Sequence, residues 1–405
     1  MRSYVWAMLV ATSLILPAFD CKHVNPKPAP PPGSWLVLLC KASDVPQEPH
    51  PASYYLTLFD KNQRDLLFDY FDLTSNHTVD VSGSEVYGWF PMSVDSATIG
   101  PNARNNSKPV TRTQTARDCI ASSLGGMAVQ GFSVDTSKYA GVLTVINIPV
   151  DSGDTGEKAV VSNGEPDISF YEHEMIHTYG QANHSWRAAR DTTSDHVWNH
   201  GTDAEYFDCL DMMSYLTCVR MFQTTGYGGQ GPELQAAYRQ NLKWFPTGRS
   251  MPAGYGLSTA TLAPLSDPSK TGSLLVTIEV PGKGSYLVEY REATGFDRGI
   301  GPSGVVIREL RNNGITYLVV RQDGSIIWRK GEMFTDTANY LSINVDDIVP
   351  GKATVTINTV FSSGAVNAGE ICGDKYHGQV RACPAGTQCM ARRTGEIQTI
   401  DYFCL

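Results

Sequence analysis

The chain has 405 residues, of which 41% are hydrophobic and 18% are charged, and its formal net charge is −9. This length exceeds what one compact domain usually reaches, so we expect two or three domains. The 41 acidic residues outnumber the 32 basic ones, and no cluster of lysine and arginine is present. This balance argues against nucleic acid as the main partner.

The N-terminus has the pattern of a secretory signal peptide. Arg2 supplies a short basic start. The apolar run at 5–16 is long enough for a signal core and short for a membrane span. We assign 1–21 to the signal, with an uncleaved anchor as the alternative, and 22–34 to a proline-rich extended linker. No later run approaches the length of a transmembrane helix.

Nine cysteines after such a start indicate disulfide bonds. Their number becomes even if Cys21 leaves with the signal. Asn76 and Asn105 begin acceptor sequons for N-glycans, which suit exposed loops. Asn183 begins a third sequon that we expect to stay unmodified. The sequence therefore predicts a secreted, extracellular glycoprotein.

The first half of the chain alternates between strand and helix patterns. The nearly all-apolar run at 35–40 predicts a strand covered on both faces. The elements expected after it are a helix at 52–73, strands within 78–92 that join at Gly83, a helix at 113–124, a strand at 141–148, a loop at 151–165 and a helix capped by Asp167. This order predicts an α/β catalytic half.

The helix after Asp167 carries the motif H-E-x-x-H. His173 and His177 lie one helical turn apart on the same face, so both imidazoles can bind one zinc ion. Glu174 lies beside them and can take a proton from a metal-bound water. Gly180 tolerates positive φ, so the chain can reverse there and bring in a third ligand. Two surface histidines on an ordinary helix are the competing interpretation of the bare motif.

The extended motif resembles the metzincin metalloprotease signature, H-E-x-x-H-x-x-G-x-x-H. That signature places the third ligand at Asn183, whereas the histidine comes one residue later, at His184. An asparagine amide is a poor zinc ligand beside imidazole, so we favour His184 and expect the turn after Gly180 to absorb the additional residue. The other candidates for the third ligand are Asn183, Asp195, His196 and His200.

The segment 203–215 resembles the methionine turn that forms an apolar floor beneath the zinc in metzincins. Met213 fits this structural role, with Met212 as the alternate, and plain core packing of both is the competing interpretation. The resemblance also implies that Tyr215 can hydrogen-bond the oxyanion of the transition state. A buried structural tyrosine fits that position equally well.

A disulfide between Cys209 and Cys218 would bracket this turn and stiffen it. Cys40 and Cys119 are then the remaining pair in the first half. Spacing does not fix connectivity, so both pairings are hypotheses.

The resemblance extends beyond the motif, over about residues 35–360. The segments WLVLLCKASD, FDYFDLTS and VDVSGSEVYGWF look like the start of gametolysin-like and immune-inhibitor-A-like secreted peptidases. YLVEYREATGFDRGIGPSGVVI resembles the β-domain that follows the protease in that family. The resemblance implies a metzincin-like zinc protease domain at 35–246, closed by a helix at 232–244.

The sequence pattern changes from residue 247 onward. Short β-type runs separated by Gly, Pro, Asn and Asp predict an antiparallel β-sandwich at 247–366, with a role in support or substrate docking. The runs are 274–280, 286–290, 304–307, 316–320, 326–328, 340–345 and 353–357. Four cysteines in 367–405 predict a small disulfide-rich C-terminal module, with a zinc knuckle as the alternative.

These features together predict a secreted zinc endopeptidase that acts on protein or peptide substrates. An extracellular-matrix or cell-surface partner would suit its location. The alternative is a catalytically inactive binding or adhesion protein on a degenerate metzincin scaffold, because the third ligand is displaced by one residue. A gluzincin with Glu205 as third ligand is disfavoured, since it would leave Gly180 and Met213 without roles.

Overall fold

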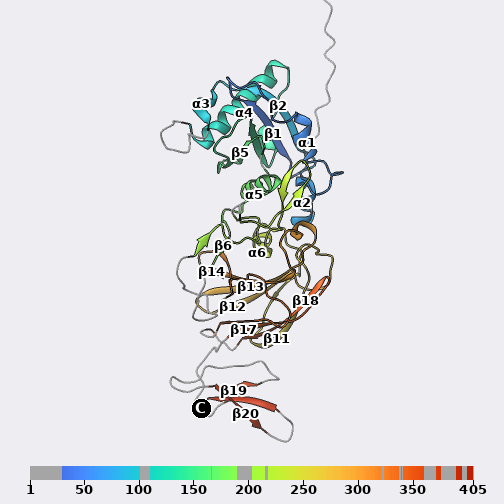
Figure 1. Cartoon of the computed structure of the whole chain (residues 1–405), viewed down its shortest axis with the longest axis vertical. Helices are drawn as coiled ribbons and strands as arrows, with labels where there is room; N and C mark the ends of the chain where they lie inside the picture. The colour runs from blue at the N-terminus through green and yellow to red at the C-terminus, as the bar shows by residue number, and fades with distance from the viewer. Residues whose placement is uncertain are drawn as a thin grey trace, which may run out of the picture.

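The structure is a computed structural model, and the described residues form a mixed α/β fold with several sheets (Figure 1). None of the helices in this part of the chain is long and apolar enough to cross a membrane. The predicted signal peptide at 1–21 lies outside the described residues. The described residues are 30–100, 110–165, 167–188, 203–214, 218–321, 323–336, 339, 341–359, 371–374, 389–394 and 399–404.

A five-stranded sheet organises the first half. Its order is β2 (Glu85–Pro91), β1 (Trp35–Lys41), β3 (Gly141–Ile146), β5 (Ala159–Asn163) and β4 (Gly153–Asp154). The first four strands are parallel, and β4 runs antiparallel at the edge. The apolar side chains of β1 are buried on both faces, as expected for a covered parallel sheet.

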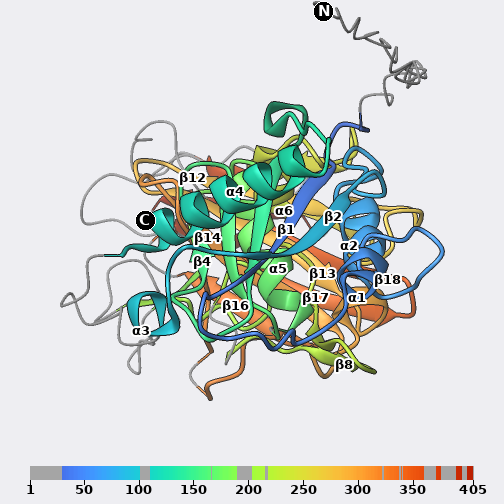
Figure 2. The same cartoon turned by 90° about the horizontal axis from the view of Figure 1, so that it is seen from above.

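Helices cover both faces of this sheet. α4 (Arg112–Val129) packs on one face, and Figure 2 shows it lying across the strands. α1 (Ala52–Thr57), α2 (Leu67–Thr74) and α5 (Ile168–Thr178) pack on the other face. In Figure 1, α5 lies between this sheet and the β sheets of the second half.

The predicted single helix at 52–73 is wrong, because two helices separated by a turn occupy that segment. The Asp60 carboxylate accepts the backbone N–H of Asn62 at 2.9 Å, and Asp65 has a φ of 58°. Such local side-chain bonds compete with helical hydrogen bonds. The chain therefore leaves the helix after Thr57 and starts again at Leu67.

The predicted loop at 151–165 contains two strands, β4 and β5. The apolar part of β5 is too short for a periodicity to appear, and its pairing with β3 fixes it as a strand. Within 78–92 only β2 is a strand, and it begins after Gly83. Asp167 precedes α5, but its side chain does not cap that helix, since it accepts the backbone N–H of Gly229 at 2.8 Å.

Two sheets of the second half share one hydrophobic core. The larger contains β10, β12, β13, β14 and β15, and the smaller has the order β11-β18-β17-β16. Their bounds are β10 (Ser250–Pro252), β11 (Gly256–Leu262), β12 (Leu275–Val280), β13 (Gly284–Arg291), β14 (Gly304–Arg311), β15 (Thr316–Leu318), β16 (Met333–Asp336), β17 (Leu341–Val349) and β18 (Lys352–Thr359).

The sequence pattern located most of these strands. It missed β10, β11 and β16. The run at 326–328 is not a strand but makes a single bridge between Trp328 and Val305. Pairing is antiparallel except where β10 meets β12 and where β15 meets a strand from the first half.

Two short strands from the first half extend the larger sheet to seven strands. β6 (Trp186–Arg187) pairs in parallel with β15, and β7 (Ala204–Glu205) pairs with β6. The segment after His184 is therefore part of the same sheet as residues beyond 247. The proposed domain border at 246 does not separate the sheets.

The remaining described elements are short. These elements are α3 (Ser96–Ile99), η2 (Thr136–Lys138), β8 (Phe222–Thr224), β9 (Gly228–Gln230), α6 (Ala236–Asn241), η3 (Gly295–Asp297), β19 (Ile371–Asp374), β20 (Cys389–Thr394) and β21 (Thr399–Cys404). The helix expected at 232–244 is the shorter α6, because the N-terminal part of that segment is extended and is held by hydrogen bonds to side chains. The disulfides expected in the C-terminal module stay a prediction.

Both disulfides expected in the first half are formed. Cys40 on β1 joins Cys119 on α4, and Cys209 joins Cys218. The first closes a sequence separation of 79 residues and the second only 9. The longer loop loses more entropy in the unfolded chain when it is cross-linked.

We expect the double substitution Cys40→Ala/Cys119→Ala to lower the free energy of unfolding by about 4 kcal/mol, as measured by urea denaturation. The control, Cys209→Ala/Cys218→Ala, should cost about 2 to 3 kcal/mol because its loop is shorter. An equal or smaller loss for the first pair would contradict the loop-entropy explanation.

Glu309 on β14 is a buried carboxyl group in the larger sheet. Arg311 Nε donates to its Oε2 at 2.7 Å, and Oε1 has no hydrogen-bond partner in the described part of the chain. Burial raises the pKa of Glu309 to about 7. The folded protein therefore binds this proton more tightly than the unfolded chain does, and the resulting stabilisation is lost as the pH rises from about 4.5 through 7.

Glu309→Gln should remove this pH dependence. The parent should lose up to about 3 kcal/mol of unfolding free energy from this group between pH 4 and pH 8, while the uncharged glutamine loses none. Thermal melts at pH 5 and pH 8 would show that the melting temperature of the variant rises relative to that of the parent only at the higher pH. Glu279→Gln, on an exposed position of β12, serves as the control. A constant difference between variant and parent across this range would refute the prediction.

Candidate metal site

The site starts from α5, which carries His173, Glu174 and His177. Tertiary packing holds the helix in place, since Met175 and Ile176 on it are fully buried in the core beneath the five-stranded sheet. Gly180 follows with a φ of 116°, a conformation that side chains with a Cβ disfavour. The chain reverses at this glycine and returns His184 to the helix.

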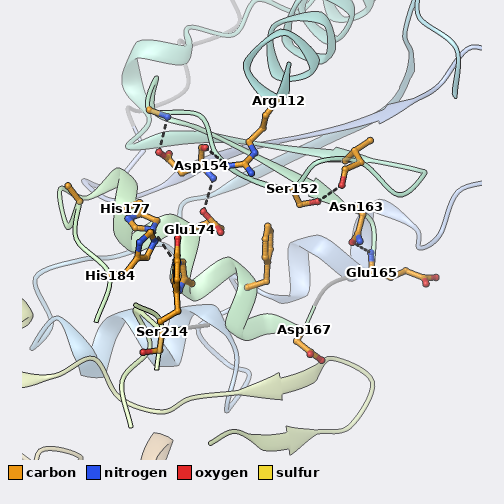
Figure 3. A pocket seen from close by; sticks show the side chains of 16 residues that line it. Arg112, Ser152, Asp154, Asn163, Glu165, Asp167, Glu174, His177, His184 and Ser214 are labelled. Carbon is orange, nitrogen blue, oxygen red and sulfur yellow. Dashed lines mark hydrogen bonds between the residues drawn. The ribbon is translucent and has the colours of Figure 1, made fainter. Parts of the chain in front are cut away.

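Three imidazole rings converge at this point. His177 Nε2 lies 3.2 Å from His173 Nε2 and 3.0 Å from His184 Nε2. The ligand atoms of the three rings all lie within 4.8 Å of one another. Figure 3 shows the side chains of His177 and His184 next to each other at one end of the cavity.

The outer ring nitrogens fix the tautomers. His173 Nδ1 lies 2.8 Å from Met212 O, and His177 Nδ1 lies 2.7 Å from Gln181 O. A carbonyl oxygen can only accept, so both Nδ1 atoms carry the proton and both Nε2 atoms present lone pairs. His184 Nδ1 lies 3.4 Å from Glu205 Oε1, a carboxylate placed as in carboxylate–histidine–zinc triads.

This arrangement fits a zinc ion. Unprotonated nitrogens about 3 Å apart repel one another unless a cation shares their lone pairs, and three imidazoles with one open position are a common zinc donor set. Burial, together with the neighbouring histidines, lowers the pKa of His173 to about 3 and that of His184 to about 4. Both rings are therefore neutral at pH 7, which is the form that binds metals.

Glu174 lies next to the histidines and points into the cavity (Figure 3). Its Oε2 accepts the backbone N–H of Asp154 on β4 at 2.7 Å, which fixes the orientation of the carboxylate. Burial raises the pKa of Glu174. A carboxylate whose pKa moves toward neutrality can both accept and return a proton, as a general base requires.

Met212 and Met213 are fully buried, and their backbone carbonyls bond to the segments that carry the histidines. Met212 O accepts from His173, and Met213 O accepts the backbone N–H of Ser185 at 2.9 Å. Both side chains belong to the hydrophobic core that also contains α5. Tyr215 lies outside the described residues, so its proposed role stays a prediction.

A cavity of about 1070 Å³ opens in front of these groups. Arg112, Asp154 and Phe170 of α5 line this cavity together with Glu174. Glu165 and Asp167 lie at the end away from the histidines (Figure 3). The edge strand β4 borders the cavity, and the backbone N–H and C=O of Asp154 on this strand are bonded to Glu174 and Arg112.

Arg112, Asp154 and Tyr206 are among the lining residues that sequence reasoning missed. Arg112 Nη1 donates to Asp154 O at 3.0 Å, and Nη2 donates to Asp151 at 2.9 Å. The ring of Tyr206 lies 4.0 Å from the ring of His184. None of Arg112, Asp154 and Tyr206 belongs to a motif. The pairing of β4 with β5 brings Asp154 here, the pairing of β7 with β6 brings Tyr206, and the packing of α4 on the sheet brings Arg112, so the sequence carried no signal for them.

The alternative third ligands either are not shown among the three converging rings or lie outside the described residues. Asn183 is exposed, and its backbone carbonyl accepts from Gln181 Nε2 at 2.9 Å. Glu205 contacts the outer nitrogen of His184. Asp195, His196 and His200 lie outside the described residues.

Comparison with protein-family models and with curated proteins finds no match to this chain. The chemistry of the site is therefore argued from its own residues.

We expect the parent protein to retain stoichiometric zinc after dialysis, measured by inductively coupled plasma mass spectrometry. His184→Ala should lose the metal because two imidazoles hold zinc far more weakly than three. Asn183→Ala, one residue away and exposed, is the matched control and should keep it. Zinc retained by His184→Ala but lost from Asn183→Ala would assign the third ligand to Asn183.

Proposed function

We propose that the chain is a secreted zinc endopeptidase with a metzincin-like catalytic domain. The observation that carries this proposal is the convergence of three imidazole Nε2 atoms beside a buried glutamate, at the wall of a large cavity. His173, His177 and His184 would hold the zinc, and Met213 would form part of the floor beneath it.

Zinc, when bound, would polarise the scissile carbonyl and lower the pKa of water toward about 7. The protein's own part is proton transfer. Glu174 would take the proton of the attacking water and then deliver it to the departing amine. The Asp154 N–H holds the carboxylate in place for both steps. Tyr215 is the proposed oxyanion donor.

The cavity supports a peptide rather than a small molecule as substrate. It is large, and charged side chains such as Arg112, Asp154 and Glu165 line it together with Phe170, so several side chains of a peptide could be bound there. Two disulfides are expected of a protein that matures in an oxidising compartment, so we place the enzyme outside the cell. A matrix or cell-surface protein would then be a suitable substrate.

Glu174→Gln should keep zinc but lose hydrolysis of a casein-type substrate by roughly 10²- to 10⁴-fold, because the amide cannot accept the proton. Fluorogenic casein hydrolysis and metal content would be measured on the same preparation. Glu157→Gln, on an exposed side chain paired with Arg117, is the control and should cleave normally.

Equal cleavage by Glu174→Gln and the parent would rule out this mechanism. A parent that holds stoichiometric zinc but cleaves no protein substrate would instead favour the binding or adhesion protein on an inactive scaffold.

A further inference from the structure

A buried hydrogen-bond relay ends on the backbone of the third histidine. Tyr238 OH donates to His184 O at 2.9 Å, and Thr316 Oγ1 donates to Tyr238 OH at 3.0 Å. Gln235 Nε2 in turn donates to Thr316 Oγ1 at 2.9 Å. All three hydrogen bonds run from donor to acceptor toward His184 O, so they polarise one another.

The same relay holds the next residue, Ser185. Gln235 Nε2 donates to Ser185 Oγ at 2.7 Å, and Ser185 Oγ donates to Asp211 Oδ2. The backbone N–H of Gln235 donates to Asp211 Oδ1 at 2.7 Å. We call Ser185, Asp211, Gln235, Tyr238 and Thr316 the His184 clamp. All five are fully buried, where an unpaired polar group would be costly.

The clamp joins the two halves of the chain. Thr316 lies on β15, and β6, which starts two residues after His184, pairs with that strand through Trp186 and Tyr317. Further along, Ala188 N donates to Leu318 O at 2.9 Å. The backbone that carries His184 is therefore fixed by the seven-stranded sheet.

Buried arginines of the same sheet anchor the methionine segment. Arg291 Nη1 on β13 donates to Leu210 O at 2.7 Å, and Arg308 Nε on β14 donates to Asp208 Oδ2 at 2.5 Å. Both guanidinium groups are buried. The carbonyl of Met212 orients His173. The residues just before Met212 are therefore also held in place by arginines of the second half.

We propose that the β sheets of the second half complete the metal site, and that Thr316 and Tyr238 are positioning residues for the third ligand. This inference rests on the proposed binding of zinc by the three histidines. The second half is then neither a separate docking module nor a passive support, because its strands fix the position of one zinc ligand.

The test uses the full chain and compares zinc affinity with thermal stability. Thr316→Val keeps the shape of the side chain and removes the hydroxyl, and Tyr238→Phe removes only the last donor of the relay. Thr359→Val is the matched control. Thr359 is also a buried threonine, and its Oγ1 accepts Gly256 N and donates to Gly254 O, both in the second half.

Zinc dissociation constants would be measured by competition with a chromophoric chelator, and cobalt substitution would report the coordination geometry. We expect Thr316→Val and Tyr238→Phe to weaken zinc binding by about 10- to 100-fold, as outer-shell changes do, and to alter the visible cobalt spectrum. Thr316→Ser should restore both. Thr359→Val should lower the melting temperature and leave zinc affinity unchanged.

Parent-like zinc affinity in both Thr316→Val and Tyr238→Phe would overturn the positioning role while leaving the proposed enzyme intact. An equal loss of affinity in Thr359→Val would overturn it too, because general destabilisation would then explain the effect. A parent that binds no zinc would remove the proposed metal site and this inference together.

Discussion

The site depends on holding three imidazole nitrogens within 4.8 Å of one another, which no single element of the chain can do. One turn of α5 fixes His173 and His177, because residues four apart share a helix face. The third imidazole has no such support. Its position depends on a glycine that lets the chain reverse and on hydrogen bonds that hold the returning backbone.

The bonds to the outer ring nitrogens link this constraint to the rest of the core. The carbonyls of Met212 and Gln181 set the tautomers of two rings, so the backbone of two separate turns determines which nitrogens face inward. A shift in either turn would change the direction of a lone pair. The methionine segment is accordingly anchored by a buried ion pair, Arg308 with Asp208, and by the hydrogen bond from Arg291 to Leu210 O.

α5 lies between two bodies of structure, each of which controls a different group of the site. The five-stranded sheet, through β4, orients Glu174 and borders the cavity. The seven-stranded sheet, through β6 and the His184 clamp, orients the third histidine. The proposed proton transfer therefore depends on the five-stranded sheet, and the proposed metal ligation depends on the seven-stranded sheet. Movement of one sheet relative to the other would affect both.

The sequence by itself determined the local parts: the α/β order of the first half, most strands of the second half and the residues of the motif. It only suggested the two disulfide pairings, which the tertiary structure decided. Periodicity and spacing carry these because they depend on neighbours along the chain. The tertiary structure alone decided that β5 is a strand, that Arg112 and Tyr206 line the cavity, and that β6 joins the seven-stranded sheet. These depend on pairing and packing between residues far apart in the chain, such as Trp186 with Tyr317, for which a single sequence has no periodic signal.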